Sequence, residues 1–371
     1  MSITKLISRW NADSSIADNI CSRNTDPPRS GNYVTFPGNL DPGLISALKE
    51  AGIESLYSHQ LAAWEAVRSG ANVVITTGTA SGKSLCYNLP VLDSLLKYTN
   101  SRALYLFPTK ALSQDQYNSL INLLDKTPID TSIKKLSSQE NEQTSSDYQW
   151  LPLSVYDGDT PVGKRSRIRN SARILFTNPD MLHIGILPRH SSWKSFFENL
   201  NYIVIDEIHI YRGVFGSHVA NVIRRLSRIL DFYRSKAQFI LTSATIANPD
   251  ELAEKLIEKD IKLIQDDGSP HGKKHFFVYN PPVVDQELGI RRSTYQECVR
   301  LAEDLAVSNI QTLIFGRSRR TVELIVSYLR QKLEGQIPVP GAIIRGYRSG
   351  YLTQERREIE QDIRSGAALI T

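Results

Sequence analysis

A run of small, hydroxyl and lysine side chains suits phosphate binding: Thr77, Gly78, Thr79, Ala80, Ser81, Gly82, Lys83 and Ser84. In such a loop, backbone N–H groups and the start of the following helix hold phosphate oxygens. Lys83 is expected to reach the β- and γ-phosphates of a nucleotide, and Ser84 to hold Mg²⁺. The general pattern has glycine where this chain has Thr77, and a chance surface turn is the alternative.

Two carboxylates follow directly on the apolar run Tyr202–Ile205, in the order Asp206, Glu207, Ile208, His209. We expect Asp206 to lie in the Mg²⁺ shell and Glu207 to orient and deprotonate an attacking water. The predicted catalytic residues are Lys83, Asp206, Glu207 and His209. By itself the tetrapeptide also fits an ordinary acidic turn at the end of a strand.

A third polar group comes after the apolar run Phe239–Leu241 and consists of Ser243, Ala244 and Thr245. Alone, this tripeptide is typical of a turn. Together and in this order, the three motifs resemble those of the DExH group of superfamily 2 helicases, which are built from two RecA-like domains. The resemblance implies ATP and Mg²⁺ as cofactors and a coupling role for Ser243 and Thr245.

The resemblance extends across nearly the whole chain. Residues 57–60 look like the adenine-recognising segment, with Gln60 as the base reader, and residues 108–112 and 177–180 match two nucleic-acid-contacting motifs. Residues 314–319 look like the first motif of the second domain. The implied nucleic-acid contacts are Thr109, Lys110, Thr177 and Arg317. Thr109 and Lys110 could equally cap the helix expected to begin near Ala111.

Longer phrases such as YLFPTKALSQDQ, TNPDMLH and TSATIANPDELAEKL are most similar to the YprA-like group. This group includes the bacterial mitomycin repair factor A and its eukaryotic relatives. The similarity implies a DNA helicase that moves 3′ to 5′ and is linked to DNA repair. RNA stays open as a partner because contacts to phosphates do not read the base.

These motifs need a scaffold, and the hydrophobic pattern supplies one. Short apolar runs that suit strands buried on both faces lie at residues 73–75, 103–107, 174–176, 202–205 and 239–241. Amphipathic stretches at residues 84–98, 111–124 and 219–233 lie between them. This alternation predicts an α/β fold with parallel sheets. Asn248 also looks like the cap of a helix that begins with Pro249.

After a Gly-, Pro- and charge-rich stretch near residues 266–274, a second such pattern begins. It comprises helices at residues 295–308 and 321–333, a strand at residues 312–315 and an apolar run at residues 367–370. We predict two RecA-like domains in tandem, the second incomplete. The expected boundaries are 1–40 for an N-terminal extension, 41–265 for the first domain, 266–290 for a linker and 291–371 for part of the second.

Composition fits this assignment without deciding it. The chain has 371 residues, 41% of them hydrophobic, a formal net charge of +5 and three cysteines without CxxC spacing. No apolar run approaches the roughly 18–20 residues of a membrane span. We therefore expect a cytoplasmic protein with no membrane partner. The sequence is silent on oligomeric state.

The resemblance also indicates what this chain lacks. The next family motif should begin near Thr371, where the chain ends, and the arginines of the last motif have no counterpart, so the chain is expected to be truncated and only weakly active alone. A non-motor enzyme such as a nucleotide kinase, or a catalytically silent nucleic-acid-binding remnant, are the competing hypotheses. The second β-α-β block and Ser243–Thr245 favour a helicase motor.

Overall fold

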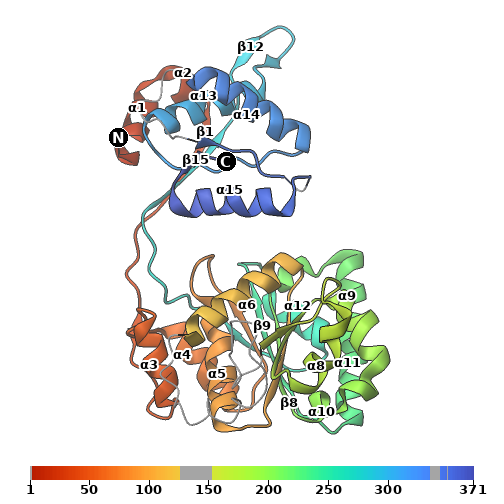
Figure 1. The fold of residues 1–371 in the computed structure, drawn as a ribbon. Coiled ribbons are helices and arrows are strands. Elements are labelled where there is room, and N and C mark those ends of the chain that lie inside the picture. Colours follow the sequence, from red (N-terminus) through yellow and green to blue (C-terminus); the bar gives the residue numbers. More distant parts are fainter. Residues whose placement is uncertain (1, 126–152, 335–342, 349) are drawn as a thin grey trace. The chain divides into compact units, whose positions relative to one another are not determined.

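The computed structural model describes residues 2–125, 153–334, 343–348 and 350–371. The chain folds into two compact units. The central unit comprises Pro28–Gly272, and the flanking unit joins Met1–Pro27 to Lys273–Thr371. The chain therefore passes from one unit to the other twice, as the red and blue-green connections in Figure 1 show.

A parallel sheet forms the middle of the central unit, and among the described residues its strand order is β10-β4-β9-β8-β5-β7-β6. Every pairing between neighbouring strands is parallel. The strands are β4 (Val73–Thr76), β5 (Arg102–Leu106), β6 (Leu153–Val155), β7 (Ile174–Thr177), β8 (Leu200–Ile205), β9 (Gln238–Ser243) and β10 (Lys262–Ile264). The α/β fold predicted from the apolar runs is confirmed.

Helices cover both faces of this sheet (Figure 1). In β5, Ala103 and Tyr105 pack into one core and Leu104 and Leu106 into the other, as the alternation of a strand requires. One face carries α3 (Pro42–Glu50), α4 (Ser58–Arg68), α5 (Lys83–Lys97) and α6 (Lys110–Asp125). The other carries α8 (Val162–Ser171), α10 (Lys194–Glu198), α11 (Gly213–Phe232) and α12 (Pro249–Ile257).

Shorter elements complete the central unit. They are the antiparallel pair β2 (Tyr33–Val34) and β3 (Leu56–Tyr57), the helix α9 (Pro179–Met181), a π-helix at Leu182–Ile186 and 3₁₀ helices at Leu187–Trp193 and Ile208–Ile210. Asn248 is the N-cap residue of α12 and Pro249 begins the helix, as predicted. The Asn248 side chain donates to Glu251 Oε2 at 2.8 Å and accepts no main-chain N–H of the first turn.

The flanking unit begins with α1 (Ile3–Ala12) and α2 (Ser14–Ala17), and β1 (Ile20–Asp26) pairs antiparallel with β11 (Lys274–Tyr279). A hairpin of β12 (Val283–Asp285) and β13 (Ile290–Arg291) follows. The rest is α13 (Thr294–Val307), α14 (Arg319–Leu333), α15 (Thr353–Ser365) and the parallel pair β14 (Ile343–Ile344) and β15 (Ala368–Ile370). Val299, Leu329 and Ile370 belong to its core.

Three segments of this unit differ from the sequence-based expectations. Residues 1–27 pack within the flanking unit, and the stretch expected as a linker, residues 266–290, contains β11 and β12. The strand predicted at residues 312–315 is found only in part, as a parallel bridge from Thr312 to Ile370. The N–H groups of Thr312 and Ile314 also donate to main-chain carbonyls of residues 369 and 371. Phe315 in that segment is 89% exposed, so the apolar run is not buried on both faces.

Asp304 of α13 joins the N-terminal helix α1 to the rest of the flanking unit by hydrogen bonds. Its two carboxylate oxygens accept from the guanidinium of Arg9 at 2.5 Å and from the indole N–H of Trp10 at 2.7 Å. Leu6 of the same helix is fully buried.

Among the described residues, none of the helices combines the length and the apolar content that crossing a bilayer would require.

Candidate functional site

The predicted phosphate loop lies between β4 and α5, where the sequence places it. Gly82 has a φ of +77° and Ala80 a φ of +61°, so the backbone turns through the left-handed region twice. A Cβ at Gly82 would meet the side-chain nitrogen of Gln60 at 2.7 Å. The hydroxyls of Thr77 and Ser81 lie 2.6 Å apart and are both buried, which closes the loop on itself.

Lys83 begins α5 with its ammonium folded back over the loop. Its Nζ donates to the carbonyl oxygens of Thr77 and Gly78, each at 2.9 Å. Ser84 follows as a half-buried residue in the first turn of the same helix. The cation and the hydroxyl expected at a phosphate site therefore lie at the helix start, beside the main-chain amides of the loop.

Gln60, predicted to read adenine, holds the phosphate loop with both ends of its amide. Its oxygen accepts from the N–H of Tyr57 at 2.9 Å, and its nitrogen donates to the carbonyl of Gly82 at 3.1 Å. The side chain is only 3% exposed. The rings of Tyr57 and Tyr33 lie next to each other, with centroids 5.4 Å apart.

Two further residues contact the loop, and sequence reasoning assigned them no role. His59 lies 3.1 Å from the carbonyl of Ser81 through Nε2 and accepts from the N–H of Gly268 through Nδ1 at 3.2 Å. Asp267 accepts from the N–H of Gly78 at 3.1 Å. His59 lay in a segment already singled out by its motif, whereas Asp267 lay in the stretch expected to be a linker, so no local signal pointed to it.

The two predicted carboxylates follow β8. Asp206 is 8% exposed, and its Oδ1 accepts from the N–H of Glu207 at 2.9 Å and from the hydroxyl of Thr242. Burial raises the pKa of Asp206 above its ordinary value, although both hydrogen bonds act in the opposite direction. Glu207 is in the left-handed region, with a φ of +55°.

His209 lies between the acidic motif and the Ser-Ala-Thr motif. Its Nδ1 is 3.1 Å from the Glu207 carboxylate and 3.2 Å from the N–H of Ala244. The nitrogen accepts from Ala244 when it is unprotonated and donates to Glu207 when it is protonated. The hydroxyl of Thr76 donates to the carbonyl of Ala244 at 3.2 Å, which joins this motif to the strand before the phosphate loop.

Ser243 and Thr245 differ in accessibility. Ser243 is fully buried, and its hydroxyl oxygen has no hydrogen-bond partner among the described residues, whereas Thr245 is exposed. Strands β4, β9 and β8 are direct neighbours in the sheet. The three motifs predicted to do chemistry therefore follow the ends of adjacent parallel strands, where open α/β sheets carry their ligand sites.

The predicted nucleic-acid contacts differ in accessibility: three lie at the surface, and the fourth, Thr177, is buried. The side chain of Thr109 accepts from the N–H of Leu112 at 3.3 Å and so caps α6, while Lys110 makes an exposed ion pair with Asp159 at 2.8 Å. Arg317 is exposed in the flanking unit. Thr177 is only 1% exposed, and its hydroxyl donates to the carbonyl of Tyr156 at 2.6 Å, so this hydroxyl does not face solvent.

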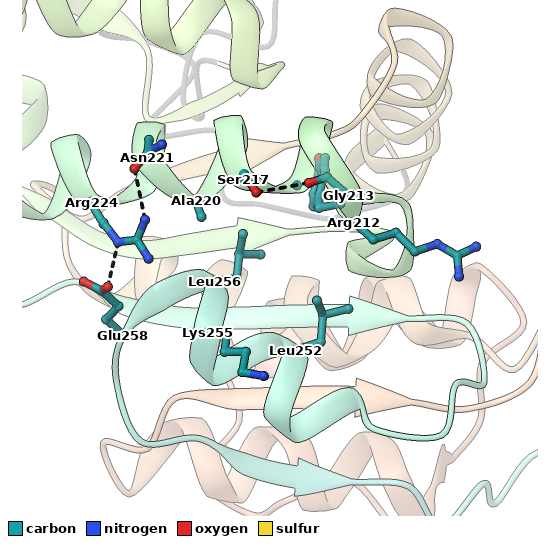
Figure 2. Close-up of a pocket in the computed structure, with 12 residues that line it drawn as sticks. Arg212, Gly213, Ser217, Ala220, Asn221, Arg224, Leu252, Lys255, Leu256 and Glu258 are labelled. Atoms are coloured by element: carbon teal, nitrogen blue, oxygen red, sulfur yellow. Dashed lines mark hydrogen bonds and ion pairs between the residues drawn. The ribbon is translucent and has the colours of Figure 1, made fainter.

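A separate groove of about 610 Å³ lies between α11 and α12. Figure 2 shows side chains from both helices along it, with Arg224 bonded to Glu258 at 2.6 Å and to Asn221 at 3.0 Å. None of the residues predicted for nucleotide or nucleic acid lines this groove. It is therefore distinct from the candidate site at the strand ends.

Comparison with known proteins agrees with this geometry. Residues 57–252 match the DEAD/DEAH box helicase family. The ATP-dependent helicase YprA of Bacillus subtilis is 48% identical over 99% of this chain and 46% of its own length. The ATP-dependent helicase hrq1 of Schizosaccharomyces pombe is 38% identical over 98% of this chain and 33% of its own length.

Among solved structures, the DUF1998 helicase MrfA bound to DNA is 46% identical, with a TM-score of 0.89, and the match covers all of this chain and 46% of that one. The chain thus spans about half the length, or less, of these relatives. The family match takes in Gln60, the phosphate loop, Asp206–His209 and Ser243–Thr245. The chain belongs to the DEAD/DEAH box helicase family.

Proposed function

We propose that this chain is the ATP-binding motor portion of a helicase that couples ATP hydrolysis to translocation along DNA and strand separation. The observation that supports this most is the hydrogen-bonded contact between motifs at three adjacent strand ends. Thr242 donates to Asp206, and Ala244 donates to His209. Thr76, the last residue of β4, donates to the carbonyl of Ala244. A metal-and-water site joined directly to a third motif suits an enzyme that must convert hydrolysis into movement.

ATP would bind at the phosphate loop, with Lys83 and the loop amides on its phosphates and the segment around Gln60 on its base. Mg²⁺ would be held by Ser84 and Asp206. The donor set fits, because Mg²⁺ prefers oxygen ligands and usually keeps phosphate and water ligands beside one or two from the protein. Asp206 is a buried carboxylate that accepts hydrogen bonds from a hydroxyl and a main-chain amide, and a cation would compensate its charge.

Glu207 is proposed as the general base. ATP would supply the electrophilic phosphorus, Mg²⁺ would neutralise charge on its phosphates, and this chain supplies the group that orients a water and takes its proton. The Glu207 carboxylate lies 3.1 Å from Nδ1 of His209. His209 would then pass a change in the charge of Glu207 to Ala244 in the coupling motif.

Nucleic acid would be held by its phosphates. Thr109 and Lys110 lie at the start of α6, where free N–H groups and a cation suit a phosphate. Arg317 in the flanking unit is a further exposed cation. Thr177 would act by positioning its loop through Tyr156 and not by direct contact. DNA as the substrate, 3′ to 5′ movement and a role in DNA repair rest on the similarity to the YprA-like group and to MrfA.

The decisive experiment measures ATP binding and ATP turnover by the purified chain with and without single-stranded DNA, and with RNA of the same sequence. A helicase motor binds ATP and turns it over faster with nucleic acid. Phosphate transfer to a small acceptor without stimulation by nucleic acid would indicate a kinase. Nucleic-acid binding without ATP binding would indicate a silent remnant, and either result would overturn the proposal.

A further inference from the structure

The segment that leads out of the central unit, Asp267–Gly272, is bonded to the phosphate loop. Asp267 Oδ2 accepts from the N–H of Gly78 at 3.1 Å, while its Oδ1 accepts from the N–H of Ser269 at 2.9 Å and from its hydroxyl at 2.6 Å. Partial burial acts to raise the pKa of Asp267, but these hydrogen bonds outweigh it and the pKa lies below its ordinary value. The carboxylate is therefore a charged acceptor for the loop.

Asp267 and Lys83 are hydrogen-bonded to opposite edges of the peptide group that joins Thr77 to Gly78. The carbonyl of Thr77 accepts from Lys83 at 2.9 Å, and the N–H that follows it, on Gly78, donates to Asp267. Because a peptide group is rigid and planar, its two edges move together. If the Lys83 ammonium leaves this carbonyl to bind a phosphate, the Thr77 carbonyl loses its hydrogen bond. The peptide group could then rotate, and the hydrogen bond from Gly78 to Asp267 would move with it.

His59 makes a second, independent link. The N–H of Gly268 donates to its Nδ1, so the neutral ring carries its proton on Nε2 and donates to the carbonyl of Ser81 at 3.1 Å. The ring is 1% exposed. Gly268 is closely packed at this point, since a Cβ there would meet the main-chain nitrogen of Ser58 at 3.0 Å.

Both connections between the units are fastened to this segment. Asn32 donates from its N–H to the carbonyl of Gly268 at 2.8 Å, and Arg29 and His271 exchange main-chain hydrogen bonds at 2.9 and 3.0 Å. The guanidinium of Arg29 also lies 3.5 Å from Asp267. The chain leaves the central unit immediately beyond these residues, at Pro28 and at Gly272.

We propose that Asp267 and His59 are positioning residues that transmit the nucleotide state of the phosphate loop to both connections between the units. The inference rests on the proposed function, because it requires ATP at this loop. Nucleotide binding draws Lys83 away from the Thr77 carbonyl, the Thr77–Gly78 peptide group turns, and Asp267 carries that movement to residues 267–272. The bridge between Arg29 and His271 passes it to residues 28–33.

Hydrogen–deuterium exchange with Mg²⁺ and AMPPNP tests this on the whole chain. Protection of residues 77–84 reports nucleotide binding, and the exchange of residues 267–272 and 28–33 reports the connections. In the unchanged chain and in Asp266→Ala, a neighbouring exposed carboxylate, we expect nucleotide to change the exchange of both connections by about fivefold, the size of one ordinary net hydrogen bond. Asp267→Ala should keep the protection of residues 77–84 and lose the response of the connections.

Each outcome distinguishes the two proposals. Absence of nucleotide protection at residues 77–84 in the unchanged chain would contradict ATP binding itself. If Asp267→Ala keeps the protection of residues 77–84 and nucleotide still changes the exchange of both connections, the transmission role is overturned. The same holds if Asp267→Ala alters the exchange of the connections without nucleotide but leaves the change caused by nucleotide the same. If Asp267→Ala melts too early to measure, Asp267→Asn keeps the size of the side chain but only one acceptor oxygen, and it should reduce the same response.

Discussion

Lys83 directs its ammonium to two main-chain carbonyl oxygens, those of Thr77 and Gly78. Replacing it with alanine should remove the charge that neutralises phosphate. By analogy with the removal of one charge-stabilising donor in other enzymes, we expect ATP turnover to fall by about 10²–10³ or more. Stability should fall by about 1–3 kcal/mol, because the carbonyl of the buried Thr77 loses its donor, whereas that of the half-buried Gly78 can bind water instead.

The measurement for Lys83→Ala is ATP turnover together with a thermal melt, and Lys49→Ala, an exposed lysine of α3, is the matched control. Normal turnover in Lys83→Ala would remove the phosphate-loop assignment. A collapse of the melt in Lys83→Ala alone would instead give the lysine a structural role.

Glu207→Gln should bind Mg²⁺ and ATP but not hydrolyse ATP. An amide can still hydrogen-bond a water but cannot take its proton. Equilibrium binding of a fluorescent ATP analogue, followed by a single-turnover assay, should reveal a complex that persists. Glu198→Gln, an exposed glutamate of α10, is the control. Normal hydrolysis by Glu207→Gln would place the general base elsewhere.

His59 should make the central unit sensitive to acid. Burial lowers the pKa of His59 in the folded chain, opposed by Asp267 and assisted by Lys83 and Arg29, which also face it. The unfolded state therefore takes up the proton more readily, and stability is full above the ordinary pKa near 6.5 and falls as pH drops below it. His59→Gln should flatten this fall, which melts at pH 7.5 and pH 5.5 would measure. Equal losses in both proteins would contradict the prediction.

At the level of single residues, the sequence predicted the groups whose chemistry is local. Lys83 and Glu207 stand in short motifs with fixed spacing, and each lies at the strand or helix end expected for it. The contacts that His59 and Asp267 make with the phosphate loop could not be predicted from such motifs. The partner of His59 is 209 residues away along the chain, and only the fold brings the two together.

Among the helices and strands, the attachment of α1 to α13 depends on one carboxylate. Asp304→Ala would leave the guanidinium of Arg9 and the partly buried indole N–H of Trp10 without their acceptor. We expect the flanking unit to lose about 1–3 kcal/mol, the usual effect of removing one partner from such bonds. Urea unfolding, followed by circular dichroism, would measure the loss.

The control for Asp304→Ala is Glu287→Ala, an exposed acidic residue of the same unit. Asp304→Asn should recover part of the stability, because its amide oxygen can still accept from one of the two donors. Equal stability of Asp304→Ala and Glu287→Ala would mean that the buried side chain of Leu6 holds α1 in place without this carboxylate.

The strands of the central sheet were predictable because they are buried on both faces and appear as continuous apolar runs. Strand β1 was not predictable, since its residues 21–26 are all exposed and only Cys21 among them is not polar, so they form no apolar pattern of helical or strand period. The strand predicted at residues 312–315 was right only in part. Its main chain is hydrogen-bonded to residues 369–371, but its side chains at Leu313 and Phe315 are exposed.

For the molecule as a whole, affinity for single-stranded DNA should fall steeply as salt rises, because the proposed contacts go to phosphates. Lys110→Ala should weaken binding for all base sequences alike and reduce the slope of log affinity against log salt by about one. When Lys110 binds a phosphate it loses its exposed ion pair with Asp159, and breaking such a pair requires little free energy. Fluorescence anisotropy across a salt series measures both effects.

Arg224→Ala serves as the control for that series, since Arg224 lies in the groove between α11 and α12, outside the proposed contacts. A slope that Lys110→Ala leaves unchanged, or that Arg224→Ala reduces by the same amount, would contradict the assignment of Lys110. Strong preference for one base sequence among strands of equal length would contradict recognition through phosphates.

The pairing of β1 with β11 also has a consequence for the order of folding during synthesis. Asp26 faces Lys274 in the register of this pair, so β1 leaves the ribosome long before its partner strand exists. The central unit is complete at Gly272 and can fold first, since domains generally fold as units during synthesis. The composition of β1 suits this interval, because its residues 22–26 are all polar and offer no apolar run that would promote aggregation in water.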